Sequence, residues 1–562
     1  MRLEPNTPGF DSLAPALTTR SAVAGRADLL NIGAILVTFA CVLLLVAPVR
    51  TFPINDDWTS AQSIAQILNG TYRQHDFIQT IALAHLMWGA LFAFIFGLSF
   101  TTLSIANLFM SAICLLVFYL LLRNLGVEAK RSLLGVALLG FNPIYVHVSY
   151  SFLTDVTFLT LMLAALLCYT RGLSGYGSHW FWLGGLATSA SYLTRQFGIL
   201  AAIAPLLYLL LARRWKWRDA LAITALPALT LIGYALWEQT QPVQLIDFAV
   251  QTVSEGFLAD PGAYVAGRSM HLVWTLFGLG IYVLPVMRLP RRPILSLPIF
   301  ALLGFFLFKS GQAYGTLVPR NGNTVDHTGY SMVGYNAQMV WSQPVWAFLS
   351  ILSALLLSLY VVYCLESLWR WFRPQEGQNR TWEPGAVAYL LALMLAGTIV
   401  LLTPTLYDRY WLGVLPLLLL PGLMPTGHST HGQPEWSRTT LALRWLLLIP
   451  IAIFSIVAQR DYMEHAAAQW WGAEQLVAQG ARRNQVSAGF EWEGWYLYEE
   501  GARRLREKPL KKYIPFPPSV VLDPVYVVSD EQQPGYKEIG SVPYRSWLNG
   551  GEERLVRLLR RE

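Results

Sequence analysis

Carboxylates lie at the ends of apolar segments in this sequence, where they could perform acid–base chemistry beside a membrane. Asp56 and Asp57 in "FPINDDWTS" follow the first long apolar run, and Asp155 in "YSFLTDVTF" lies between two others. A carboxylate can act as general base toward a hydroxyl group. At the hydrocarbon edge it is costly without a partner, so functional roles are expected there. All three aspartates are therefore candidate catalytic residues.

Each aspartate also has an ordinary structural explanation. "TD" before an apolar run is common helix-capping chemistry, so Asp155 could cap a helix. Acids in exposed loops are frequent, which applies to Asp56 and Asp57. Neighbouring side chains on a helix diverge by about 100°, so only one of this pair is expected to point into a given site.

Arginines follow in two short polar stretches. Arg195 and Gln196 lie in "YLTRQFG", and Asp408, Arg409 and Tyr410 lie in "LYDRYWLG". A guanidinium can donate two parallel hydrogen bonds to a phosphate. The alternatives are an arginine that reaches lipid headgroups and an Asp–Arg pair that closes a loop. These residues are candidate ligands of a phosphate.

Several familiar catalytic patterns are missing from the sequence. It contains no metal-ligand spacing, no P-loop, no glycine-rich nucleotide fingerprint and no nucleophile elbow. We therefore expect any sugar or phosphate chemistry to use a lipid-borne activated substrate rather than a nucleotide.

The composition predicts a polytopic membrane protein. Of 562 residues, 54% are hydrophobic and only 13% are charged, against about a quarter charged in soluble domains. The formal charge of +7 is attributed to Lys and Arg residues in cytoplasmic loops. It does not indicate a nucleic-acid site, and no nucleic-acid partner is predicted. The four cysteines all fall in apolar segments, so a disulfide framework is not expected.

The positive-inside rule sets the predicted topology. There are four clusters of Lys and Arg, which begin at Arg123, Arg213, Arg288 and Arg370. All four lie on the cytoplasmic side of the membrane only if the apolar stretch 81–98 does not cross the membrane. We expect that stretch to be an interfacial helix on the outer face. About thirteen spans result, with the amino terminus inside: 29–49, 105–122, 132–150, 156–170, 180–194, 197–212, 219–238, 271–288, 294–309, 344–364, 385–404, 411–424 and 441–457.

Three regions follow from this pattern. Residues 1–28 are predicted to be a cytoplasmic tail, and residues 29–457 a transmembrane domain whose first outer loop is 50–104. The charged segment 458–562 is predicted to be a small soluble α/β domain on the outer side. It should contain a helix near 461–480 and a strand at "VYVVS". Its aromatic stretch "FEWEGWYLYEE" could stack on sugars, although the formation of a core is favoured.

The order of these motifs resembles the GT-C superfamily of membrane glycosyltransferases. The acidic pair, "FNP…SYSFLTD", "LTRQFG" and "YDRYWLGVLPLLLLP" are most similar to bacterial family 39-type enzymes, which are related to protein O-mannosyltransferases and the lipid A aminoarabinose transferase. The resemblance covers roughly residues 29 to 425. The family's acidic motif often reads Asp-Glu and its "PPL"-like stretch is replaced here by "LAHLMWG".

The resemblance implies transfer of a hexosyl or pentosyl group from a polyprenyl-phosphate donor to an acceptor hydroxyl. The expected place is the outer, periplasmic face of a bacterial cytoplasmic membrane. Asp56 aligns with the family's catalytic aspartate and Asp57 with its second acid. The implied substrate and lipid-phosphate ligands are Arg195, Gln196, Asp408, Arg409, Tyr410 and His85.

The implied mechanism is a single displacement that inverts the anomeric centre, with an aspartate as general base. Arg195 or Arg409 would stabilise the departing lipid phosphate. Asp155 would either hold a divalent cation (Mg²⁺ or Mn²⁺) together with Asp56 or orient the acceptor, and both alternatives stay open.

Two other function classes compete with this hypothesis. A transporter or flippase of lipid-linked saccharides would place ionisable groups near the bilayer midplane and often shows internal repeats. Here the acids gather at one predicted face, which favours an enzyme. A ligase that moves a preassembled glycan would need a wider cavity. The acceptor is open between lipid A, a cell-wall polymer, a lipid-linked sugar and a protein hydroxyl.

Overall fold

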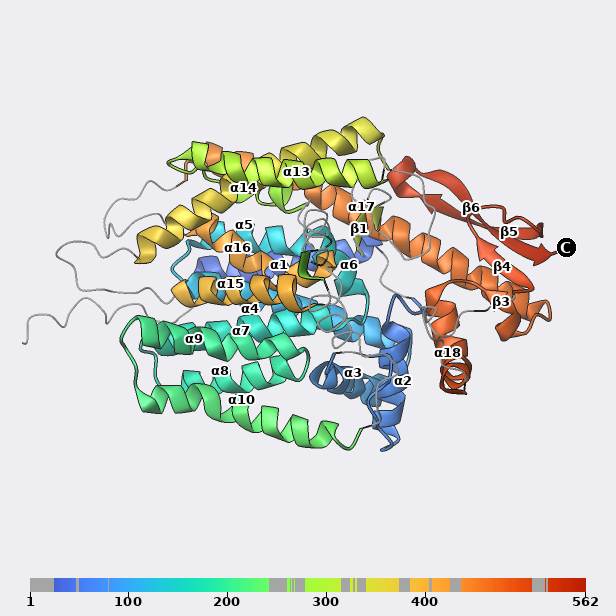
Figure 1. The fold of residues 1–562 in the computed structure, drawn as a ribbon, viewed down its shortest axis with the longest axis horizontal. Coiled ribbons are helices and arrows are strands. Elements are labelled where there is room, and N and C mark those ends of the chain that lie inside the picture. Colours follow the sequence, from blue (N-terminus) through green and yellow to red (C-terminus); the bar gives the residue numbers. More distant parts are fainter. Residues whose placement is uncertain are drawn as a thin grey trace, which may run out of the picture.

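The computed structural model is a long helical bundle with a small β-sheet at one end (Figure 1). The predicted tail at 1–28 and the predicted span at 271–288 lie mostly or partly outside the residues it describes. Those residues are 25–46, 50–78, 80–241, 260–262, 264, 267, 278–314, 324–326, 329–330, 340–372, 385–403, 407–424, 436–507, 521 and 524–562.

The elements are named in chain order. The first part contains α1 (Arg26–Val46), α2 (Asp57–Leu68), α3 (Leu83–Phe96), α4 (Phe100–Asn124), α5 (Ala129–Gly140), α6 (Pro143–Tyr150), α7 (Thr154–Leu173), α8 (His179–Tyr192), η2 (Gln196–Ile199), α9 (Leu200–Leu211) and α10 (Trp217–Glu238). Then follow η4 (Leu284–Val286), η5 (Pro293–Leu295), α13 (Ser296–Tyr314), β1 (Val325–Asp326), β2 (Gly329–Tyr330), α14 (Gln343–Phe372), α15 (Gly385–Leu402), η6 (Asp408–Gly413) and α16 (Leu415–Leu423). The last part contains α17 (Arg438–Ala478), η7 (Arg483–Gln485), β3 (Val486–Ser487), α18 (Phe490–Glu507), β4 (Tyr526–Ser529), β5 (Tyr536–Ser546), η8 (Trp547–Asn549) and β6 (Glu552–Arg561).

Six of the described helices are long and apolar enough to cross a membrane: α1, α4, α7, α10, α14 and α17. The bent pair α5–α6 makes a seventh if it counts as one span. The protein is thus a multi-pass membrane protein, but the predicted thirteen spans are not reproduced by length and composition.

Short helices and a bent helix pair account for part of the difference. At a rise of 1.5 Å per residue, α8 and α9 with 14 and 12 residues reach only about 21 and 18 Å, below the hydrocarbon thickness of about 30 Å. The predicted span 132–150 is divided, because α5 and α6 meet at 62°. Pro143 opens α6, and the Asn142 side chain caps it by accepting the N–H groups of Ile144 and Tyr145.

Helix α3 corresponds to the stretch predicted to be interfacial. With 14 residues it is about 21 Å long and too short to cross alone. One face buries His85 and Leu86, whereas Met87 and Phe94 on the other are exposed. A helix that packs on the protein with one face and exposes apolar side chains on the other is consistent with an interfacial helix, and its position in a bilayer stays a prediction.

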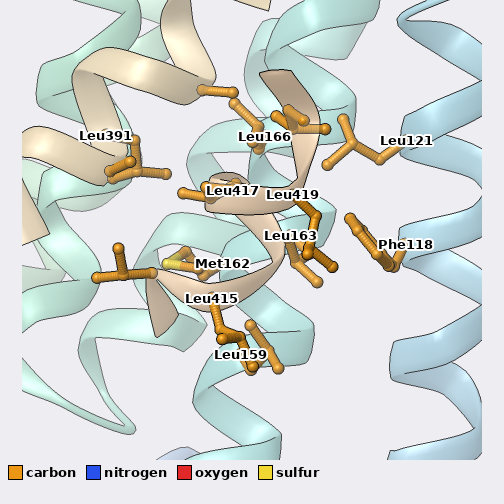
Figure 2. Packing of buried hydrophobic residues seen from close by; sticks show 14 of the residues in the cluster. Phe118, Leu121, Leu159, Met162, Leu163, Leu166, Leu391, Leu415, Leu417 and Leu419 are labelled. Atoms are coloured by element: carbon orange, nitrogen blue, oxygen red, sulfur yellow. The ribbon is translucent and has the colours of Figure 1, made fainter. Parts of the chain in front are cut away.

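The apolar core fixes the loop that carries Arg409. Figure 2 shows leucines of α16 inserted among side chains of α4, α7 and α15. The first residues of α16 therefore cannot shift without opening voids, which costs stability in a close-packed interior. Short η6 immediately precedes α16 and is held against α7, where Gly413 lies close to Phe158. The residues labelled in the figure are Phe118, Leu121, Leu159, Met162, Leu163, Leu166, Leu391, Leu415, Leu417 and Leu419.

Helix α17 joins the bundle to the carboxyl-terminal sheet. It runs without interruption for 41 residues, so the predicted boundary at 458 falls inside it. The sheet has the order β3-β4-β6-β5, with β3 and β4 parallel and the other pairs antiparallel. Gly472 of α17 lets Leu558 of β6 approach the helix closely. The predicted strand "VYVVS" is β4, and the predicted helix near 461–480 is the end of α17.

The aromatic stretch near 490 forms α18. Trp492 is fully buried and packs beside Trp470 of α17 at 5.1 Å between ring centroids. Tyr498 is also buried and faces Trp58 of α2. These aromatics build the core of the domain and its contact with α2, which agrees with the favoured alternative.

Candidate active site

The loop between α1 and α2 directs its two aspartates to different partners. Asn55 adopts a left-handed backbone conformation with φ of +51°, which asparagine tolerates better than most residues. Asp56 lies at the start of α2 with its side chain one-third exposed. Its Oδ2 is 3.7 Å from Nη2 of Arg409. The nearby guanidinium favours the ionised form of Asp56, and the exposed part of its side chain can meet a substrate.

Asp57 faces the interior and is completely buried. Its Oδ2 pairs with the buried guanidinium of Arg50 and accepts the Ile54 N–H at 3.2 Å. Its Oδ1 accepts the Phe152 N–H at 2.6 Å. Both oxygens are thus engaged, and Asp57 ties the loop to the connection between α6 and α7.

Asp155 forms a second acid–arginine pair. It lies in the first turn of α7, where Leu153 occupies the N-cap position, so Asp155 does not cap this helix. Its Oδ2 is 2.8 Å from Nη2 of Arg195, and both side chains are buried. Nε of Arg195 donates to Oγ1 of Thr154 at 2.8 Å. These two contacts fix the guanidinium, which lies 5.5 Å from the centroid of the Tyr410 ring.

The "DRY" residues of η6 have three different surroundings. Asp408 is buried and accepts the N–H groups of Val325 and Arg409, each at 2.8 Å. Burial raises the pKa of this carboxyl to about 7. Arg409 faces Asp56, so its guanidinium does not pair with its neighbour Asp408. The Tyr410 ring lies close to two guanidinium groups, with its centroid 5.5 Å from the Arg195 guanidinium and 5.9 Å from the Arg409 guanidinium.

A small hollow opens between these groups. Its polar wall consists of Asp155, Arg195, Arg409 and Tyr410. Its apolar wall consists of Phe158, Phe197, Leu395, Ile399, Leu412 and Gly413. Two positive groups beside an apolar surface can hold an anion that carries an apolar chain.

Two predicted ligands lie differently from the rest. His85 is buried, with Nδ1 2.8 Å from Oγ1 of Thr157 and Nε2 3.1 Å from the Phe152 carbonyl oxygen. Both ring nitrogens are engaged, so His85 joins α3 to α7. Gln196 follows Arg195 directly, but its side chain is exposed.

Three residues near the site were not identified from the sequence. Arg50 directly follows the first predicted span, and an arginine at such a position is usually interpreted as a residue that reaches the lipid headgroups. His147 of α6 is buried and bonded to Oε1 of Gln459 in α17 at 3.0 Å. Glu491 of α18 accepts the Asn55 N–H at 3.0 Å, across 436 positions of sequence. Only Arg50 had a local signal, namely a charge directly after an apolar run.

The possible metal pair does not fit a divalent cation as it is arranged. Asp56 and Asp155 each face a guanidinium, and two positive charges beside the site oppose binding of Mg²⁺ or Mn²⁺. Within the described part of the chain, no three His, Cys, Asp or Glu side chains gather to hold a metal ion.

A family model and several solved structures are similar to this chain. Residues 82–237 match the model described as dolichyl-phosphate-mannose-protein mannosyltransferase. This segment includes Asp155 and Arg195 but neither Asp56 nor Arg409. No curated protein matches the chain.

Solved structures give more distant matches. The protein O-mannosyltransferase Pmt1–Pmt2 complex of S. cerevisiae, bound to the sugar donor, is 16% identical with a TM-score of 0.32 over 39% of this chain and only 33% of that one. ArnT from Cupriavidus metallidurans, bound to undecaprenyl phosphate, is 14% identical with a TM-score of 0.39 over 88% and 74%. The oligosaccharyltransferase AglB from Archaeoglobus fulgidus, with an inhibitory peptide and a dolichol-phosphate, is 12% identical with a TM-score of 0.42 over 89% and 69%.

Proposed function

We propose that this chain is a membrane glycosyltransferase of the GT-C superfamily and that it transfers one sugar from a polyprenyl-phosphate donor to an acceptor hydroxyl. The observation that carries the proposal is the pairing of Asp56 with Arg409 and of Asp155 with Arg195, with both guanidiniums beside the Tyr410 ring. A base and two phosphate-binding groups then lie within one small site.

The donor phosphate is assigned to the two guanidiniums. Arg195 is fixed by Thr154 and Asp155, so little conformational freedom is lost when it binds an anion. The hollow has a volume of only about 10 Å³, so in this proposal it widens along its apolar wall at Phe158 and Leu395 to admit the first isoprene units. As the sugar leaves, negative charge grows on the phosphate oxygens, and fixed positive groups stabilise that charge.

Asp56 is assigned the role of general base. The acceptor oxygen attacks the anomeric carbon while its proton passes to the Asp56 carboxylate. The bond from the anomeric carbon to the phosphate oxygen breaks, and the phosphate leaves with the bonding electrons. A single displacement inverts the anomeric centre. Asp57 positions the loop, and Asp155 orients Arg195.

The mechanism uses the side chains of this chain alone. The two carboxylates that the resemblance implies as ligands of a divalent cation are paired with Arg195 and Arg409. In this proposal the site faces the periplasm across a bacterial cytoplasmic membrane, with the basic clusters on the opposite side.

The function is tested with a panel of radiolabelled polyprenyl-phosphate sugars and extracted envelope fractions. The purified protein in liposomes should consume at least one donor and label one fraction, which identifies the acceptor class. Labelled products larger than one sugar would indicate a ligase instead. Movement of intact lipid-linked sugar across the vesicles without release of polyprenyl phosphate would indicate a transporter.

The pH dependence of transfer should reflect the environment of Asp56. Burial raises the pKa of this carboxyl, while Arg409 and its positive charge oppose the rise. The base form is lost as pH falls through the raised pKa, so the rate should decline at a higher pH than about 3.9, the ordinary value for aspartate. Initial rates at saturating donor between pH 4 and 9 measure this limb. A rate that stays constant down to pH 4 would contradict the assignment.

A further inference from the structure

The loop that carries the proposed base is held from the carboxyl-terminal domain. The Asn55 N–H, directly before Asp56, donates to Oε1 of Glu491 at 3.0 Å. A buried backbone N–H without an acceptor is costly, so this bond stabilises the left-handed turn at Asn55. That turn sends the two following side chains in different directions, Asp56 toward Arg409 and Asp57 toward Arg50.

Helix α18 also packs against the first turn of α2. Trp58 is fully buried, with ring centroids 5.1 Å from Tyr498 and 6.1 Å from Phe490. Gly494 makes this approach possible, because a Cβ at that position would lie 2.3 Å from the indole of Trp58. The Tyr498 hydroxyl donates to Oδ1 of Asp76 at 2.6 Å. The two helices are therefore held together by packing, and α18 is also hydrogen-bonded to the segment that follows α2.

The first turn of α18 is also tied to the sheet and to α17. Glu493 accepts a hydrogen bond from the Ser487 hydroxyl of β3 at 2.8 Å. Trp492 packs on Trp470 of α17, and α17 continues into the helical bundle, where Gln459 contacts His147. A continuous set of contacts thus fixes Glu491 relative to the site. Figure 1 shows α18 next to α2 and below the β-sheet.

We propose that Glu491 is a positioning residue that holds the turn at Asn55 so that Asp56 faces Arg409. The carboxyl-terminal domain is then part of the catalytic unit rather than a separate module for the acceptor. This inference rests on the proposed function only for its effect on catalysis, since the effect on the loop is measurable without activity. The role needs an acceptor oxygen and not a charge, which suits a carboxyl whose pKa burial raises to about 7.

The test compares Glu491→Gln, which keeps an acceptor oxygen, with Glu491→Ala, which removes it. In the full-length protein, Glu491→Ala should speed hydrogen exchange in the peptide around residues 54–58 and lower kcat about tenfold, the effect of losing one hydrogen bond. The donor KM should change less than kcat. Glu491→Gln should restore both loop protection and kcat. Glu499→Ala, on the exposed face of α18, is the matched control and should behave like wild type.

Other outcomes decide against the proposal or separate it from the function. Unchanged exchange in Glu491→Ala would overturn it, and so would equal losses of kcat in the Ala and Gln variants with the loop still protected. If wild type transfers no sugar, the exchange data still decide whether Glu491 holds the loop, while the proposed function fails. If Glu491→Ala does not fold, Gly494→Ala takes its place: it should push α18 from Trp58 and speed the same exchange, and unchanged exchange there would equally overturn the proposal.

Discussion

Replacing Asp56 by asparagine should lower kcat for sugar transfer by about 10²–10⁴-fold, the usual contribution of a general base. The amide has the same shape but cannot take the proton of the acceptor hydroxyl. The donor KM should change little, because the donor phosphate is assigned to the arginines. The ion pair of Asp56 with Arg409 is loose, at 3.7 Å, so its loss should disturb Arg409 only slightly. Initial rates at saturating and limiting donor separate the two parameters.

The matched control is Asp219→Asn, in the first turn of α10. It changes the same atoms outside the site and should keep wild-type rates. If Asp56→Asn retains more than about a tenth of wild-type kcat, the loss is smaller than general-base catalysis usually gives. The base would then have to be another group, and Asp155, whose carboxylate lies across the site, would be tested next.

The sequence predicted the fold where one helix spans one apolar run. The predicted spans 29–49, 156–170 and 219–238 correspond to α1, α7 and α10 within a few residues, because hydrophobic length is a property of the segment itself. It failed for 132–150, where hydropathy continues but the cap at Asn142 starts a new helix axis. The hydropathy of a segment indicates that it is buried in an apolar environment, but not where the helix axis changes direction.

The candidate site was predictable only in part, for a physical reason. Asp56, Asp155, Arg195 and Arg409 each stand out as a charge at the edge of an apolar run, and the structure brings them together. The pairs they form depend on packing between distant segments, which no single motif records. The bond from Asn55 to Glu491 has no sequence signal for the same reason.

The spacing of Asp56 and Asp57 predicted that their side chains diverge, but not which of them is buried. The difference comes from Arg50, which lies seven residues before Asp57. Its guanidinium is as buried as the carboxylate it meets. A buried charge needs a partner, so the position of Arg50 decides which aspartate turns inward.

Asp57→Ala should therefore act on stability rather than on the chemical step. It leaves the guanidinium of Arg50 buried without its carboxylate, which typically costs about 3–5 kcal/mol. It also removes the acceptor of the Ile54 and Phe152 N–H groups. The thermal unfolding midpoint in detergent should fall clearly, together with the yield of folded protein. Asp56→Ala should leave the midpoint close to that of wild type, because its side chain is partly exposed and its pair is loose.

A double variant separates the ion pair from the other contacts of Asp57. With Arg50→Met and Asp57→Leu together, no charge is left buried, and replacing such a pair by apolar side chains is often neutral. The midpoint should recover part of the loss, limited by the two backbone N–H groups that still lack their acceptor. A double variant no more stable than Asp57→Ala would mean that those backbone bonds, and not Arg50, dominate. If Asp57→Ala instead unfolds like wild type and abolishes transfer, the roles of the two aspartates are exchanged, and Asp57 is the base.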